Sequence, residues 1–146
     1  MSFTLLRFRQ VVRRSLALAA ALALCGGSPA WAQLLKEQPT GYSQSGVKVT
    51  QWTYLSDGLR VKGLLFVPPA GKNRKLPTVI FCHDGISGVS KSHRLSSIRL
   101  AQKGYVVFSP SYRGEDGSEG TVEIAKGEVR DVLAALDILD KRPEVD

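Results

Sequence analysis

The hydrophobic pattern predicts a chain that begins with paired strands. Residues 47–54 alternate loosely between apolar and polar positions and are rich in β-forming side chains, and residues 59–67 repeat that composition. Between them stand Asp57 and Gly58, a common signal for a two-residue hairpin turn. We therefore expect an antiparallel hairpin at the edge of a sheet.

A continuous apolar run, residues 78–82, follows a polar connector that ends at Pro77. Runs without alternation are typical of strands that are buried on both faces of a parallel sheet. The polar, glycine-containing segment 83–88 comes next. The sequence thus predicts a buried strand with a turn at its carboxyl end, where open α/β sheets bind ligands.

Helices and strands alternate in the rest of the chain. The spacing of apolar residues predicts a helix over residues 91–104 with Gly104 as its C-terminal cap, a strand over 105–108 and a helix over 122–141. The apolar face expected for the last helix comprises Val122, Ala125, Val129, Val132, Leu133, Leu136 and Leu139. A helix in such a sheet normally leads to another strand, so we expect the first half of a larger domain.

The first 32 residues are expected to be a signal peptide. An arginine-bearing start precedes the apolar run 15–24, which is shorter than the roughly 20 residues that cross a bilayer. Ala30-Trp31-Ala32 then offers a small-x-small cleavage site, so we expect cleavage before Gln33 and export to the periplasm or medium. Sec and twin-arginine export both remain open. Residues 33–46 are expected to be an extended lead-in.

The net charge argues against nucleic acid as a partner. The chain has 20 basic and 13 acidic residues, but the expected signal holds four arginines and no acid. Removing it leaves a net charge near +3, which is too small and too dispersed for a basic stripe. After cleavage we expect no membrane association.

Cysteine and histidine usage gives no sign of a disulfide, a metal or a cofactor. Cleavage would remove Cys25 and leave Cys82, which we interpret as a small buried strand residue rather than a nucleophile. His83 and His93, with Asp84 between them, lack zinc spacing. Phosphate-binding glycine patterns are absent from the sequence.

Taken in order, these segments resemble the N-terminal half of an α/β-hydrolase, in the group of dienelactone hydrolases and prolyl oligopeptidase-like peptidases. The resemblance implies an incomplete α/β-hydrolase fold over residues 47–146: an N-terminal hairpin, then strand–helix–strand–helix of a mostly parallel sheet. It rests on residues 78–82 running into His83-Asp84-Gly85, on 104–110, on Tyr112-Arg113-Gly114, and on 127–136 before 142–146.

The resemblance makes His83, Asp84 and Gly85 candidates for an oxyanion hole, because the family's turn after this strand donates a backbone N–H to the developing anion. Asp84 departs from the commoner His-Gly-Gly and adds a carboxylate. The alternative is a plain strand-to-helix turn in which the aspartate caps the helix. Tyr112-Arg113-Gly114 is interpreted as structural, with the arginine paired to an acid.

The family's nucleophile motif, Gly-x-Ser-x-Gly, is absent from this sequence, so we expect no catalytic residue in the chain. Residues 85–89 come close, but Val89 stands where the motif has glycine. Ser87 with His93 as its base is a further arrangement, which we disfavour because isolated Ser and His residues usually cap or face solvent.

Two functions follow. The first is the N-terminal portion of an exported serine hydrolase (an esterase, lactonase or peptidase) that is inactive alone and, when intact, acts on a small ester or peptide. The alternative is a non-catalytic, hydrolase-like binding module. Such a module would have to cover its open sheet edge, for example as a homo-oligomer.

Overall fold

A computed structural model describes residues 31–44, 46–69 and 74–146. The expected signal peptide lies almost wholly outside these residues. Residues 31–146 form one compact unit. Among the described residues, no helix has the length and apolar character needed to cross a membrane.

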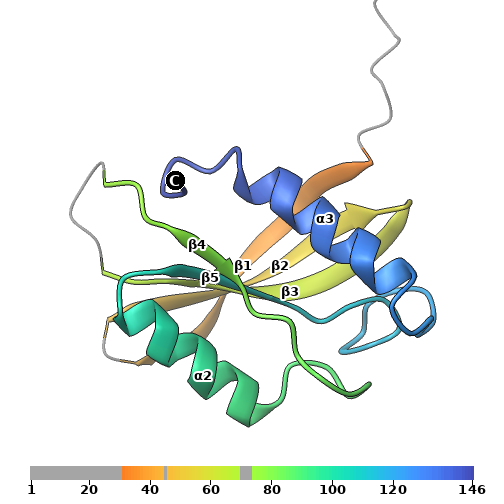
Figure 1. Cartoon of the computed structure of the whole chain (residues 1–146), viewed down its shortest axis with the longest axis horizontal. Helices are drawn as coiled ribbons and strands as arrows, with labels where there is room; N and C mark the ends of the chain where they lie inside the picture. The colour runs from red at the N-terminus through yellow and green to blue at the C-terminus, as the bar shows by residue number, and fades with distance from the viewer. Residues whose placement is uncertain (1–30, 45, 70–73) are drawn as a thin grey trace, which may run out of the picture. The chain divides into compact units, whose positions relative to one another are not determined.

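The described strands form one mixed sheet in the order β1-β2-β3-β5-β4 (Figure 1). The β1–β2, β2–β3 and β3–β5 pairs are antiparallel, and β5 and β4 are parallel. With two helices, this arrangement confirms an incomplete α/β fold. The strands are β1 (Ala32–Gln44), β2 (Val47–Ser56), β3 (Leu59–Val67), β4 (Thr78–Ile80) and β5 (Val106–Pro110).

The hairpin prediction is confirmed by β2 and β3, whose register runs from Ser56 opposite Leu59 to Lys48 opposite Val67. At the turn, Asp57 and Gly58 have φ angles of 51° and 80°. Positive φ at both central residues is the geometry that suits the right-handed twist of a hairpin. Asp57 and Gly58 therefore form the tight turn that connects β2 to β3.

The extended lead-in is a strand, which the sequence did not reveal. Residues 33–44 belong to β1 and pair with β2, with a register irregularity between Pro39 and Ser43. A proline is tolerated there because β1 lies at the edge of the sheet. Its polar composition fits an edge position equally well.

The prediction of a strand buried on both faces over residues 78–82 is wrong. β4 ends at Ile80 and its residues are half-buried, since it lies at the other edge of the described sheet and pairs with β5 alone. Cys82 is exposed, so its interpretation as a buried hydrophobic residue is also wrong. The fully buried strand is β5, which has a neighbour on each side.

The first predicted helix is confirmed as α2 (Lys91–Gln102), and Gly104 follows it with a φ of 96°. Its N-cap is Ser90, whose hydroxyl accepts from the backbone N–H of His93. The second helix, α3 (Gly127–Leu139), begins five residues later than expected. Ile124 and Ala125 have φ angles of 52° and 61°, which prevents an earlier start.

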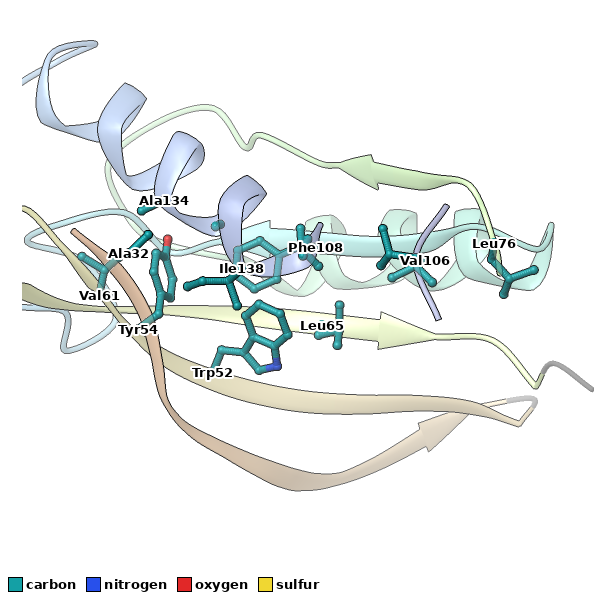
Figure 2. Close-up of a cluster of buried hydrophobic side chains, with 13 residues drawn as sticks. Ala32, Trp52, Tyr54, Val61, Leu65, Leu76, Val106, Phe108, Ala134 and Ile138 are labelled. Carbon is teal, nitrogen blue, oxygen red and sulfur yellow. The ribbon is translucent and has the colours of Figure 1, made fainter. Parts of the chain in front are cut away.

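Alternating side chains of the sheet form a separate core on each face, with α3 over one face and α2 over the other (Figure 1). On the α3 side, Trp52 and Tyr54 pack around Phe108 (Figure 2), with the Trp52 and Phe108 ring centroids 4.9 Å apart. On the α2 side, Phe66 and Val107 pack with Ile98. The two cores hold the carboxyl ends of β4 and β5 in place.

The face that α3 presents to the sheet differs from the expected one. The helix packs through its small residues and its C-terminal end, while Val129, Leu133 and Leu136 remain 44–49% exposed. These three residues are called the exposed face of α3 below. The buried residues of the helix are Gly127, Asp131, Ala134, Ala135, Ile138 and Leu139.

Candidate functional site

The candidate site lies where two loops leave the same edge of the sheet. Because β4 and β5 are parallel, the turn after β4 (residues 81–90) and the loop after β5 (residues 111–126) emerge together. A cavity of about 320 Å³ opens between these loops and the N-terminal half of α3. Its lining includes Cys82, His83, Gly85, Tyr112 and Glu115.

His83 is buried within this edge and is not a solvent-facing residue. Its Nδ1 lies 3.0 Å from the carbonyl oxygen of Asp84. Its ring packs against those of Tyr112 and His93, with centroid distances of 4.5 Å and 5.5 Å. The imidazole therefore contacts two aromatic rings and one carbonyl oxygen.

Glu115 is the carboxylate that faces His83, a pair that no local sequence pattern predicts. His83 Nε2 lies 3.2 Å from Glu115 Oε2, within ion-pair distance although the angles are not those of a hydrogen bond. Burial raises the pKa of Glu115, against the opposing influence of His83 and of the backbone N–H of Gly88. The two side chains thus face each other in a desolvated position.

Asp84 turns its side chain away from the cavity edge. Its carboxylate is almost fully exposed, and Oδ1 lies 2.9 Å from Nε2 of His93 in the first turn of α2. The aspartate does not cap the helix, since Ser90 is the N-cap. The alternative of a helix-capping aspartate is therefore wrong, and the carboxylate is paired with a histidine.

Gly85 provides the backbone that lines the cavity. Its φ is 76°, a conformation that L residues rarely adopt, and a Cβ here would meet no atom within 4 Å. Within the described part of the chain, the N–H groups of Asp84 and Gly85 have no protein acceptor. These amides are free to donate to an oxygen atom of a ligand.

The arrangement of Ser87 with His93 is not formed. Both ring nitrogens of His93 have other partners: Nε2 faces Asp84, and Nδ1 accepts from the backbone N–H of Ser90 at 3.3 Å. Ser87 is exposed on the turn. Among the described residues, no serine hydroxyl is hydrogen-bonded to a histidine ring nitrogen. These residues also contain no group of three or more His, Cys, Asp or Glu side chains able to hold a metal ion.

Tyr112, which the sequence analysis interpreted as part of a structural turn, also lines the cavity. It is buried with a φ of 38°, directly after β5. Burial and a hydrogen bond with Cys82 raise the pKa of its phenol well above the usual value. Its position in the sequence could have indicated this, because β4 and β5 are parallel neighbours and the residues that follow β5 lie beside the turn that follows β4.

Arg113 has the structural role that the sequence predicted. Its guanidinium bonds Asp131 of α3, with Nη2 2.8 Å from Oδ1, and it also contacts Asp57 of the hairpin turn at 3.1 Å. Hydrogen bonds to Asp131 raise the pKa of Arg113 despite its burial. This residue fastens the loop after β5 to the hairpin and to the helix.

Comparison with known proteins identifies relatives among hydrolases. No family model matches the chain. It is 37% identical over 92 residues to the uncharacterized peptidase YtmA of Bacillus subtilis, covering 63% of this chain and 35% of YtmA. It is 31% identical over 106 residues to dipeptidyl-peptidase 5 of Porphyromonas gingivalis, covering 66% of this chain and 16% of that protein.

Solved structures share the fold. Acetyl xylan esterase 1 from Thermoanaerobacterium superposes with a TM-score of 0.64 at 16% identity, covering 76% of this chain and 41% of the esterase. XC6422 from Xanthomonas campestris, an α/β serine hydrolase without a lid, gives 0.51 at 21% identity, covering 59% of this chain and 42% of that one. The chain thus spans less than half of each of these proteins.

Proposed function

We propose that this chain is the N-terminal portion of an exported serine hydrolase of the α/β-hydrolase family. The reaction is acyl transfer on a small ester or peptide. Similarity to two peptidases and to the fold of an esterase supports both substrate classes.

The turn after β4 is the observation that carries this proposal. Its unpaired amides at Asp84 and Gly85 lie at the carboxyl end of a parallel strand, and Gly85 lines a cavity of about 320 Å³. Preorganised N–H donors stabilise the oxyanion of a tetrahedral intermediate, and one such donor contributes about 10²–10³-fold to kcat. The chain's part in the reaction is to hold this negative charge.

The nucleophile, its base and its acid belong to residues outside 31–146 in this proposal. The support is that the chain spans 35% of YtmA and that its described residues form no nucleophile cluster. The chain alone then shows no turnover of nitrophenyl acetate. Robust hydrolysis that Ser87→Ala abolishes would overturn the proposal.

The direct test is to read the nucleotide sequence beyond codon 146 and to produce the longer protein, if the frame continues. We expect a Gly-x-Ser-x-Gly motif and hydrolysis of nitrophenyl acetate, which replacement of the motif serine by alanine abolishes. A longer protein that is folded but hydrolyses neither an ester nor a peptide panel would contradict the assignment.

The exposed face of α3 favours a second function, that of a binding module. Val129, Leu133 and Leu136 form an apolar strip on a helix that follows the site, and apolar strips of this kind mark interaction surfaces. A module of this type would cover the strip by homo-oligomerisation or with another chain. Sedimentation of the exported protein separates the two functions, because a compact, stable monomer argues against the module.

A further inference from the structure

His83 determines the direction of the Gly85 amide. A carbonyl oxygen can only accept, so the His83 Nδ1 that lies 3.0 Å from the Asp84 oxygen carries a proton. In a trans peptide, the C=O of one residue and the N–H of the next point in opposite directions. With no cis bond among the described residues, fixing the Asp84 carbonyl against the imidazole aims the Gly85 N–H away from the ring.

Glu115 in turn fixes the imidazole. The opposite nitrogen, Nε2, faces the Glu115 carboxylate across 3.2 Å, within ion-pair distance. The side chains of His83 and Glu115 are 0% and 2% exposed, so water does not compete for this contact. A flipped or freely rotating His83 would leave both the carboxylate and the Asp84 carbonyl without their partner.

The same loop also holds the far end of the turn. Oε2 of Glu115 accepts from the backbone N–H of Gly88 at 3.1 Å, and Oδ2 of Asp116 accepts from that of Val89 at 2.9 Å. The carboxylate of Asp116 lies so close that a Cβ on Gly88 would be 2.3 Å from it. Residues 83–89 are thus fastened at both ends by two neighbouring acids.

We propose that Glu115 is a positioning residue that sets the direction of the Gly85 N–H through the His83 imidazole and the Asp84 carbonyl. The geometric link stands on the contacts alone. Its consequence for catalysis rests on the proposed function, in which the Gly85 N–H is an oxyanion donor. A loosened turn would weaken a contact made in the transition state, which lowers kcat more than it changes KM.

The geometric link is tested by NMR on ¹⁵N-labelled protein with Glu115→Ala and Glu115→Gln. Alanine removes the carboxylate that faces Nε2, so we expect the His83 ring nitrogen resonances and the Gly85 amide resonance to move. Glutamine keeps the size of the side chain and can donate to Nε2, but the same atom cannot then accept from Gly88, so both signals should move less than in the alanine variant. Glu119→Gln, on the same loop but exposed and paired with Arg60, is the matched control and should change neither.

The proposal is overturned if folded Glu115→Ala keeps the His83 ring nitrogen resonances and the Gly85 amide resonance of the parent. If the alanine variant does not fold, Glu115→Gln decides, because an Nε2–H tautomer of His83 in that variant contradicts the link. In the longer protein, Glu115→Ala should lower kcat by up to about a hundredfold with little change in KM, and glutamine should restore most of it. Absence of hydrolysis in the parent would contradict the proposed function and leave the NMR result standing.

Discussion

The Arg113 guanidinium and the Asp131 carboxylate form a buried ion pair, and the backbone N–H of Arg113 donates to the same carboxylate. Nη2 lies 2.8 Å from Oδ1, and the backbone N–H of Arg113 donates to Oδ2 at 2.8 Å. Their side chains are 3% and 0% exposed. The pair joins the loop after β5 to α3, and the two walls of the cavity depend on it.

Replacement of Asp131 by alanine should therefore destabilise the protein by about 3–5 kcal/mol, because it leaves a buried guanidinium without its main partner. Urea unfolding followed by circular dichroism measures this change. Glu119→Gln breaks the exposed pair with Arg60 and should leave the unfolding midpoint almost unchanged. Equal midpoints for Asp131→Ala and the parent would refute the role assigned to this pair.

Gly63 in β3 is a glycine for reasons of space. A Cβ at this position would lie 2.4 Å from Cζ of Phe108, a fully buried ring of the α3-side core (Figure 2). Gly63→Ala should cost about 1–3 kcal/mol of unfolding free energy through overpacking. The double variant with Phe108→Leu should lose less unfolding free energy than the two single variants lose together, because the smaller side chain leaves room for the methyl group. If the two losses are strictly additive, the Phe108 ring is not what the methyl group contacts.

Two buried phenols should titrate only when the protein unfolds. Burial raises the pKa of Tyr54 and of Tyr112 above the usual value of 10.0, with Asp131 and Cys82 respectively as further causes. The folded state thus holds these protons more tightly than the unfolded state does. Their contribution to the free energy of unfolding is therefore complete below about pH 10 and is lost as the pH rises further.

An alkaline titration that follows phenolate absorbance and circular dichroism together measures this linkage. Tyr112→Phe should remove amplitude from the absorbance step that coincides with loss of the circular dichroism signal. If Tyr54 and Tyr112 both ionise while the circular dichroism remains native, the assigned burial is wrong.

Local signals predicted the parts of the fold whose cause is local. The Asp57-Gly58 turn identifies the β2–β3 hairpin, and the apolar spacing with Gly104 identifies α2, because turn chemistry and helix periodicity act over a few residues. The His83-Asp84-Gly85 turn was found in the same way, from its place after an apolar run.

Features that depend on distant neighbours could not be predicted. The strand β1 exists because β2 lies beside it, and Cys82 is exposed because β4 is at the edge of the described sheet. Glu115 is 32 positions from His83 and meets it only because β4 and β5 are parallel neighbours. Sequence periodicity contains no information about such adjacency.

Export is predicted by the N-terminal 32 residues and is tested by N-terminal sequencing of the protein recovered outside the cytoplasm. We expect Gln33 as the first residue of the mature chain. Ala30→Asp should block processing and leave the precursor, because signal cleavage requires small residues at this site. Protein that stays in the cytoplasm with its N-terminus intact would exclude the export signal.

The oxyanion role assigned to the turn after β4 is tested most directly by the structure of the longer protein after reaction with an alkyl fluorophosphonate. We predict an adduct on a serine outside residues 1–146, with the phosphonyl oxygen about 2.7–3.1 Å from the backbone nitrogen of Asp84 or Gly85. An adduct on Ser87, or a phosphonyl oxygen bound away from the turn that follows Cys82, would contradict the proposal that this turn binds the oxyanion and that the nucleophile lies outside residues 1–146.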